Sequence, residues 1–208
     1  MKLNNYDAIA GSYDTLSRMV FFKAQVNAQK EQLNCIPAGA SILIVGGGTG
    51  WLLEEIAKVH SSGLDITYLE ISQNMLALAR KRNYGNNTIT FIHQAIEEYN
   101  VSQRFDIIQT AFLFDNFSEE RAAKVFNMLL KHLKPGGYWL YSDFKVEAKA
   151  SGWKKAMLQL MYLFFSKIAH IEARRLPAME LMFQAAGCPI VARNRHYGGF
   201  IESIIFRK

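Results

Sequence analysis

Residues 42–57 carry the spacing in this sequence that most clearly indicates binding chemistry. They read ILIVGGGTGWLLEEIA, an apolar run that ends in four glycines within five residues and continues as a helix-like pattern. Glycines at such a turn can adopt positive φ, and a helix that follows points its free N–H groups at the same place. The turn is therefore a candidate site for a dinucleotide, a nucleoside triphosphate or a sulfonium nucleoside, or else a tight turn without a ligand.

The spacing of the glycines separates these ligands. A Walker loop ends in Gly-Lys-Ser/Thr, which is absent here. The dinucleotide pattern Gly-x-Gly-x-x-Gly, counted from Gly46, reaches Gly48 and then Trp51, whose indole would obstruct close helix–strand packing. The pattern that remains is Gly46-x-Gly48-x-Gly50, so a dehydrogenase ranks low.

A carboxylate follows the glycine turn at the distance expected for a nucleoside site. Glu70 ends the second apolar run, in YLEIS, 24 positions after Gly46. An acid roughly 20 positions after the turn accepts hydrogen bonds from ribose hydroxyls in related folds. A surface carboxylate at a strand end is the alternative, but the turn and the acid occur together in the right order, which favours the ribose role.

Strand-like and helix-like segments alternate along most of the chain. This alternation predicts right-handed crossovers and a mostly parallel sheet with helices on both faces. Ser72 and Ser118 are each placed to cap a helix. The last two runs flank Tyr197-Gly198-Gly199 as a hairpin, so the final strand should be antiparallel. The strand-like runs are Ser41–Val45, Asp65–Ile71, Thr88–His93, Phe105–Phe112, Gly137–Phe144, Val191–His196 and Phe200–Arg207.

The fold expected from this pattern is α/β, a Rossmann-like, doubly wound, seven-stranded sheet with a helical lid insertion. The length of 208 residues suits a single domain, 1–208. Residues 1–35 should form an N-terminal helical cap. Residues 146–188 interrupt the alternation and should form a lid over the carboxyl edge of the sheet, where ligands bind in such folds.

Composition and cysteine usage narrow the setting. The formal charge of +6 permits an acidic substrate, RNA or a membrane surface without requiring any of them. Cys35 and Cys188 lie in no metal-ligand spacing, so we expect no metal site and a reducing, cytoplasmic setting. MKLNNYDAIAGSYD has no apolar signal core. The most apolar segment, Ala156–Phe165, is about half the length of a spanning helix.

Five segments, in order along almost the whole chain, resemble motifs of the class I S-adenosylmethionine-dependent methyltransferases. They are YDAIAGSYDTLS, IVGGGTG, YLEISQNMLALAR, FDIIQTAFLFDNF and LKPGGYWLYSDF. The likeness is greatest to the group that includes quinone-ring and other small-molecule methyltransferases. It implies the cofactor S-adenosyl-L-methionine and in-line transfer of its methyl group to a small, partly apolar molecule.

The resemblance also implies roles for individual residues. The glycines would line the methionine part of the cofactor, Glu70 would hold the ribose, and Thr110 would lie under the methionyl chain. Tyr13 would close the site from the N-terminal helix. The implied cofactor-binding residues are Tyr13, Gly46, Gly48, Gly50, Glu70, Ile71, Met75, Gln94, Ala95, Ile96, Thr110 and Ala111.

Two positions depart from the family pattern. Ile44 stands where the family usually has an acid before the first glycine, and Ala95 where it often has an acid near the adenine amine. Gln94 could supply its side-chain oxygen instead. The departures motivate one alternative, a cofactor-binding protein that has lost turnover. LIVGGG also resembles aminopropyltransferases of the spermidine synthase type, which is a second alternative.

The acceptor side offers two candidate catalytic acids. A sulfonium methyl is already activated, so the acceptor atom must mainly be held in line with it, about 3 Å away. A base is needed only if the acceptor must lose a proton. Asp143, at the end of the fifth run, and Asp115, after the fourth, are the candidates, although Asp115 could instead cap the next helix. Further pocket candidates are Asn116, His170, Arg174, Arg175 and Tyr197.

Two segments bear on the partner. Thr110-Ala111-Phe112-Leu113 lacks the Asn/Asp-Pro-Pro-Tyr/Phe motif of nucleobase amino-methylating relatives, which argues against nucleic acid. Residues 153–171 are apolar around nearly a full helix turn, and a lid helix buried on the core is the commoner outcome. The alternative is an apolar substrate channel or peripheral membrane contact, with Lys154, Lys155 and Lys167 at anionic headgroups.

Overall fold

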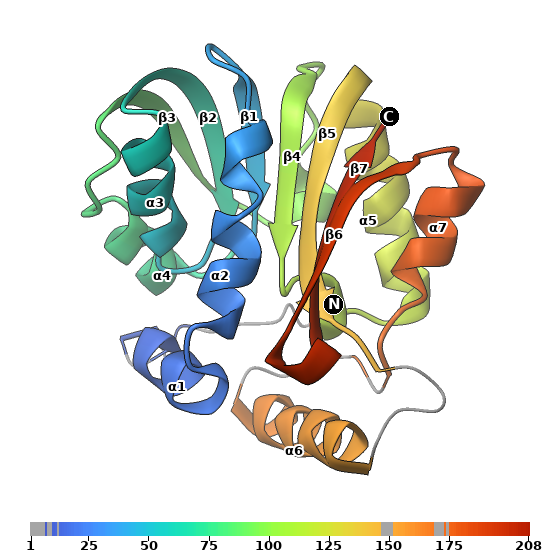
Figure 1. Ribbon diagram of the computed structural model, residues 1–208. Coiled ribbons are helices and arrows are strands. Elements are labelled where there is room, and N and C mark those ends of the chain that lie inside the picture. Colours follow the sequence, from blue (N-terminus) through green and yellow to red (C-terminus); the bar gives the residue numbers. More distant parts are fainter. Residues whose placement is uncertain (1–6, 8–9, 12, 147–151, 169–172, 174) are drawn as a thin grey trace.

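A seven-stranded sheet forms the centre of the computed structural model, which describes residues 7, 10–11, 13–146, 152–168, 173 and 175–208 (Figure 1). The strand order is β3-β2-β1-β4-β5-β7-β6, and only β7 runs antiparallel to its neighbours. This confirms the predicted Rossmann-like sheet, mostly parallel with an antiparallel C-terminal strand. The strands are β1 Ser41–Val45, β2 Ser62–Glu70, β3 Asn86–His93, β4 Phe105–Ala111, β5 Leu133–Phe144, β6 Ile190–His196 and β7 Ile201–Arg207.

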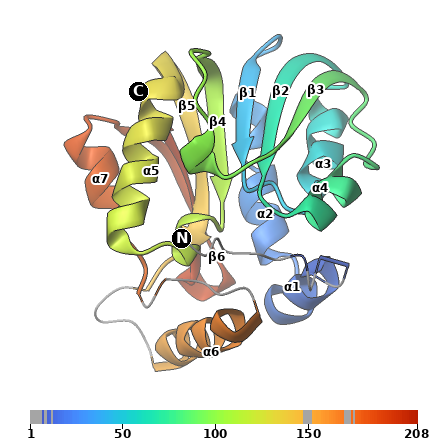
Figure 2. The same ribbon diagram turned by 180° about the vertical axis from the view of Figure 1, so that it is seen from behind.

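Helices cover both faces of the sheet. Figure 1 shows α2 and α3 in front of it, and Figure 2 shows α5 and α7 on the opposite side. Each face therefore has its own buried apolar cluster. The helices are α1 Tyr13–Phe21, α2 Ala24–Lys30, α3 Trp51–Val59, α4 Gln73–Ala79, α5 Glu119–His132, α6 Gly152–Ile168 and α7 Met179–Ala185, with short 3-10 helices η2 Leu33–Cys35, η3 Ile96–Glu98, η4 Phe114–Asn116 and η5 Tyr197–Gly199.

The helix starts follow from local capping. The Ser72 hydroxyl accepts from the Met75 N–H at 3.1 Å, and the Ser118 hydroxyl accepts from the Arg121 N–H at 3.3 Å. Both serines thereby satisfy one of the unpaired N–H groups of a first helical turn, as predicted. Three strands begin two or more residues earlier than expected: β2 at Ser62 rather than Asp65, β3 at Asn86 rather than Thr88, and β5 at Leu133 rather than Gly137. A register shift of β5 against β4 accommodates its additional residues.

The carboxyl end of the sheet has a third apolar cluster, which joins α1, α2, α6 and the β6–β7 connection. Its buried members are Phe21, Ala28, Phe144, Met161, Phe200 and Ile201. Both ribbon views place α1 and α6 at this end (Figures 1 and 2). In the described part of the chain, no helix has both the length and the apolar character needed to cross a membrane. The end of the molecule where ligands are expected therefore contains an apolar cluster to which α1, α2 and α6 contribute.

Candidate functional site

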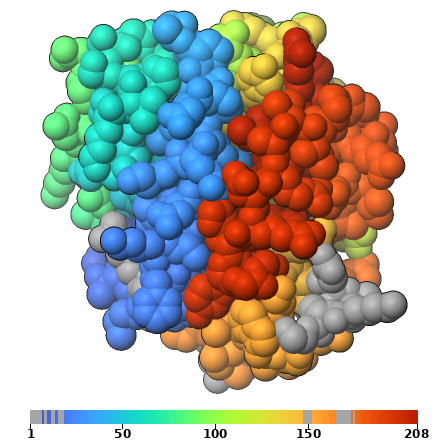
Figure 3. Space-filling view, in the orientation of Figure 1, coloured from blue at the N-terminus to red at the C-terminus, as the bar shows by residue number. Residues whose placement is uncertain are grey.

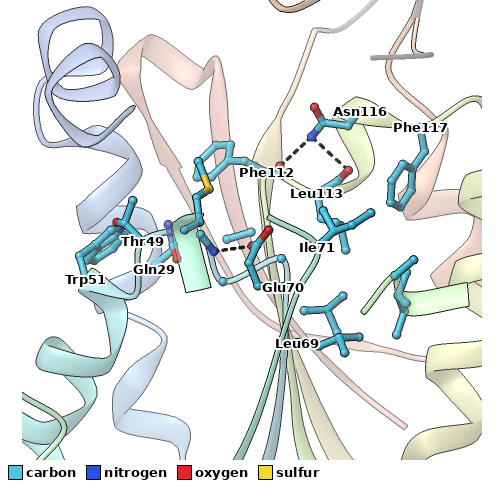
Figure 4. Close-up of a pocket in the computed structure, with 18 of the residues that line it drawn as sticks. Gln29, Thr49, Trp51, Leu69, Glu70, Ile71, Phe112, Leu113, Asn116 and Phe117 are labelled. Carbon is cyan, nitrogen blue, oxygen red and sulfur yellow. Dashed lines mark hydrogen bonds between the residues drawn. The ribbon is translucent and has the colours of Figure 1, made fainter. Parts of the chain in front are cut away.

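A pocket lies at the carboxyl ends of β1, β2, β3 and β4 (Figure 4). Its walls come from the loops that follow these strands and from α1 and α2. Since these loops meet where the strand order changes direction, the position is the one expected for a ligand in a doubly wound sheet. The lining residues are Asp14, Gln25, Val26, Gln29, Val45–Thr49, Trp51, Leu69–Ile71, Met75, Gln94–Glu97, Ala111–Leu113, Asn116, Phe117 and Arg121.

The glycine turn presents bare backbone to this pocket. Gly48 has φ +64°, and a Cβ built on it would meet only the Met75 sulfur, at 3.9 Å. Space beside Gly48 is therefore open. Gly50 has φ +79°, but a Cβ there would lie 2.6 Å from the Cα of Ala79 in α4. Gly50 is thus required for packing of the turn against α4, and it lies outside the pocket lining.

Glu70 joins the glycine turn to the start of α4. One carboxylate oxygen accepts from the Gly48 N–H at 2.8 Å and the other from the Ser72 N–H at 2.8 Å. Figure 4 shows the first of these bonds inside the pocket. Burial raises the pKa of Glu70, whereas the N–H groups of Ser72 and Gly48 oppose that rise. An ionised carboxylate has about four acceptor positions, so Glu70 can accept further hydrogen bonds from a ligand.

The N-terminal helix α1 is fastened to the glycine turn by an ion pair. The Thr49 hydroxyl donates to the Asp14 carboxylate at 2.7 Å, and Arg82 donates to the same carboxylate at 2.9 Å. Arg82 also donates through Nε to the Thr49 carbonyl at 3.0 Å. Tyr13 begins α1, but its side chain lies outside the described residues. The contact between α1 and the pocket therefore rests on Asp14, which the sequence did not single out.

Most of the residues expected to bind the cofactor line this one pocket. They are Gly46, Gly48, Glu70, Ile71, Met75, Gln94, Ala95, Ile96 and Ala111. Thr110 does not, because its side chain faces the other side of the sheet and accepts from the Trp139 indole at 2.9 Å. The roles of all these residues toward a cofactor stay predictions, since the structure gives their positions and not their contacts with a cofactor.

The positions that lack the family's acids have apolar surroundings. Ile44 is fully buried in the core on the α3 side, and Ala95 is 5% exposed at the pocket wall. Gln94 donates through Nε2 to the Glu98 carbonyl at 3.0 Å. Its Oε1 remains the candidate acceptor for the adenine amine.

Two buried glutamines of α2 form a pocket wall that the sequence analysis missed. Gln25 and Gln29 are each 8% exposed, and both line the pocket. They are four residues apart and therefore share one helix face. The Gln29 side-chain oxygen accepts from Gln109 of β4 at 3.3 Å, which fixes it against the sheet. The i,i+4 spacing of two amides was the available signal.

Asp115 and Asp143 lie beside the pocket, not in its lining. Asp143 is 2% exposed and Asp115 9%. Asn116, which does line the pocket, donates through Nδ2 to Asp115 at 2.9 Å. Asp143 accepts through Oδ1 from the Phe144 N–H at 2.8 Å. Its Oδ2 and the buried Tyr162 hydroxyl make no hydrogen bond within the described residues.

The two acids influence each other's protonation. Burial raises the pKa of Asp115 to about 7. Burial, and then repulsion from Asp115, raise the pKa of Asp143 well above its usual range. A charge on one of two neighbouring buried carboxyls disfavours a charge on the other. With a pKa of about 7, Asp115 changes its protonation state near neutral pH.

The other pocket candidates lie elsewhere. His170 and Arg174 are outside the described residues. Arg175 is exposed and forms an ion pair with Glu119. The Tyr197 hydroxyl donates to the Val20 carbonyl at 3.0 Å and ties the β6–β7 connection to α1. Within the described residues, no cluster of three or more His, Cys, Asp or Glu side chains could hold a metal ion.

The sheet order defines a Rossmann-like fold, and the glycine turn after β1 and the acid that ends β2 lie where such folds bind nucleosides. Comparison with known proteins indicates which family with this fold the chain resembles. A family model described as "Methyltransferase domain" matches residues 42–137. The family model and the curated methyltransferase relatives indicate the class that the motifs predicted, the class I S-adenosylmethionine-dependent methyltransferases. This class implies the use of S-adenosyl-L-methionine, and the aminopropyltransferase alternative is not favoured.

Curated relatives of this chain are methyltransferases, and a solved structure shares its fold. A demethylmenaquinone methyltransferase of Listeria monocytogenes serotype 4a is 26% identical over 93% of this chain and 90% of its own. Malonyl-[acyl-carrier protein] O-methyltransferase 2 of Ilyobacter polytropus is 31% identical over 50% of this chain and 39% of its own. The N-methyltransferase NodS of Bradyrhizobium japonicum WM9, in complex with S-adenosyl-L-homocysteine, shares the fold at 14% identity, with a TM-score of 0.67 over 95% of this chain and 98% of NodS.

Proposed function

We propose that the pocket holds S-adenosyl-L-methionine and presents its methyl group to a small, partly apolar molecule with a quinone-type or hydroxylated ring. The observation that carries this proposal is Glu70, a buried carboxylate at the end of β2 that contacts the glycine turn and retains acceptor capacity. The relatives named for demethylmenaquinone support the substrate class. A cytoplasmic location, expected from two free cysteines, belongs to the same proposal.

The residues present fit such a nucleoside. Glu70 would accept from the ribose hydroxyls, and the open space beside Gly48 would receive the methionine part. Ile71, Met75 and Ile96 would supply apolar contact to the adenine from two sides of the pocket. When bound, the cofactor supplies an activated sulfonium methyl group. The protein then has to orient the acceptor and exclude water.

The acceptor would approach along Phe112. This residue lines the pocket and has φ +51°, a conformation that bulky side chains rarely adopt. Its ring lies 5.0 Å from the Phe144 ring in the apolar cluster beneath α6. Backbone strain of this kind concentrates at functional sites. The apolar wall that runs from the pocket toward α6 suits a partly apolar acceptor and not a charged one.

Asp115 and Asp143 would accept the proton that the acceptor releases on methylation. If the nucleophile is a ring hydroxyl, its proton would pass to this pair while the oxygen forms its bond to the methyl carbon and the carbon–sulfur bond breaks. Asn116 connects the pair to the pocket, because it lines the pocket and donates to Asp115. The raised pKa values suit a base that works near neutral pH.

A methylation assay tests the function. The protein is incubated with S-adenosyl-L-methionine carrying a deuterated methyl group, together with demethylmenaquinol or a soluble hydroxynaphthoquinone reduced in place. Mass spectrometry should show the labelled methyl group on the ring compound and S-adenosyl-L-homocysteine in equal amount. Calorimetric binding of S-adenosyl-L-homocysteine without methylation of either ring compound would contradict the substrate class and leave the cofactor site intact.

The raised pKa of Asp115 also predicts how stability depends on pH. A carboxyl whose pKa rises on folding, from 3.8 to about 7, binds its proton more tightly in the native state. The free energy of unfolding contributed by this group therefore falls as the pH rises from about 4 to about 7. Asp115→Asn keeps the acceptor for Asn116 and removes the charge, so its Tm should exceed the parent's by several degrees at pH 8. The difference should shrink toward pH 5.

Thermal melts of both proteins from pH 5 to pH 8 measure this effect. Asp106→Asn serves as the control, because the pKa of Asp106 is lowered by hydrogen bonds with Ser41 and Lys134 despite its burial. Its Tm should fall below the parent's at pH 8. A Tm difference for Asp115→Asn that stays constant across this range would mean that Asp115 is not a high-pKa group.

A further inference from the structure

The most exposed apolar side chains at the carboxyl end of the sheet belong to α1 and α6. Met19 is 71% exposed, Phe22 70%, Leu160 61% and Leu163 57%. Single exposed apolar residues are ordinary, but a group at one end of a molecule marks an interaction surface. Both ribbon views put α1 and α6 at this end, and Figure 3 shows them with the β6–β7 connection as one continuous end.

We propose that this end of the molecule, called here the docking face, binds an anionic lipid bilayer. It consists of Met19, Phe22, Lys23, Trp153, Lys154, Leu160, Leu163 and Phe164. The proposal goes beyond the chemistry of the pocket, because it assigns a surface and not a reaction.

The helix α6 has an inner and an outer side. Met157 and Met161, four residues apart, pack into the third apolar cluster. Leu160 and Leu163, three apart, are 61% and 57% exposed. Since successive residues turn by about 100°, Leu160 and Leu163 lie on a side of the helix turned by roughly 110° from Met157 and Met161. The inner side is satisfied by the fold, and the outer side has apolar area that the fold does not bury.

The residue that follows α1, Phe22, exposes its aromatic ring and has a strained backbone conformation. Phe22 has φ +53°, a left-handed conformation that is strained for a residue with a side chain. Its neighbour Phe21 is 4% exposed and packs against Phe144 at 5.3 Å. The turn therefore buries one ring and exposes the next. A strained backbone combined with an exposed ring indicates a contact outside the molecule.

The charges on this face favour an anionic bilayer over an apolar protein partner. Lys23 follows Phe22 directly, and Lys154 lies over the Trp153 ring at 5.8 Å. The nearby carboxylate of Asp14 is already paired with Arg82. A surface that combines Trp, Phe and Leu with flanking Lys is typical of segments that lie in the headgroup region. The pocket is at the same end, so an apolar acceptor dissolved in the bilayer would be close to it.

Vesicle flotation with the full chain tests the proposal. The protein should float with vesicles of equal parts phosphatidylglycerol and phosphatidylcholine at low salt, and much less with phosphatidylcholine alone or at high salt. Lys23→Gln with Lys154→Gln should weaken binding to anionic vesicles by at least about tenfold, since each lysine near the surface contributes about fivefold. Leu160→Ser should weaken it by about tenfold through lost apolar burial.

Phe22→Gly separates docking from a structural role. Glycine adopts the left-handed conformation without strain, so the Tm should stay level or rise while vesicle binding falls about tenfold. Val59→Ser is the matched control, because Val59 is 46% exposed and is the last residue of α3. This helix runs away from the end of the sheet where α1 and α6 lie (Figure 1). The control variant should float like the parent.

Either of two results would overturn the docking face: no flotation of the parent with anionic vesicles at low salt, or equal flotation of Leu160→Ser, Phe22→Gly and Val59→Ser. Titration with S-adenosyl-L-homocysteine on the same preparations keeps the two proposals apart. Cofactor binding without flotation rejects the docking face alone, and flotation without cofactor binding rejects the proposed function alone.

Discussion

Glu70→Gln should weaken the binding of S-adenosyl-L-homocysteine by about 1–3 kcal/mol, which is roughly 5- to 150-fold in Kd. The Glu70 carboxylate is 5% exposed, accepts from the N–H groups of Gly48 and Ser72, and has acceptor positions left for the ribose. Glutamine keeps the shape but replaces an accepting oxygen with a donor. The loss therefore falls on hydrogen bonds to a charged acceptor.

Isothermal titration of the variant and the parent measures this loss. Glu120→Gln, on the exposed surface of α5 and paired with Lys124, is the control and should bind like the parent. Because Glu70 also fixes the glycine turn, each Kd is taken well below the variant's own Tm. An unchanged Kd for Glu70→Gln would show that the ribose is held elsewhere.

Gly50→Ala should mainly lose stability and Gly48→Ala should mainly lose cofactor affinity, although both glycines have left-handed φ. At Gly50 the new Cβ would collide with Ala79 at 2.6 Å, so strain and overpacking together should cost roughly 2–5 kcal/mol and lower the Tm by about 6–15 °C. At Gly48 the Cβ meets only the Met75 sulfur at 3.9 Å. The stability cost there is the left-handed strain alone, roughly 1–2 kcal/mol.

Cofactor affinity should show the opposite order, with the larger loss for Gly48→Ala. The Gly48→Ala methyl group would occupy the space proposed for the cofactor, so its Kd for S-adenosyl-L-homocysteine should rise at least about tenfold, as overpacking of roughly 1–3 kcal/mol implies. Gly50→Ala, where it is folded, should bind within a few-fold of the parent. Thermal melts and titrations of both variants give the comparison. Equal Kd values for the two would mean that the open space beside Gly48 is not the binding site.

Local signals predicted the sheet and the centre of the pocket. The alternation of segments, the caps at Ser72 and Ser118, and the spacing from Gly46 to Glu70 all depend on residues close in sequence or on strand ends that the topology must bring together. These features are set by backbone geometry, which neighbouring residues determine.

The residues that were missed or misplaced depend on tertiary packing. Gln25 and Gln29 reach the pocket because α2 packs against the sheet; their i,i+4 spacing puts them on one helix face but does not say against which surface that face packs. Thr110 and Ala111 were assigned together, but successive residues of a strand face opposite sides, and Trp139 binds Thr110 on the far side. Gly50, expected among the cofactor-binding glycines, lies outside the pocket lining and packs against α4.

A crystal structure of the protein with S-adenosyl-L-homocysteine would show whether Glu70 and the glycine turn hold the cofactor. We expect the nucleoside between the glycine turn and the loop after β3, with the ribose hydroxyls within hydrogen-bonding distance of the Glu70 carboxylate and the homocysteine part beside Gly48. Density for the ligand at any other place, or a ribose that makes no contact with Glu70, would contradict this expectation.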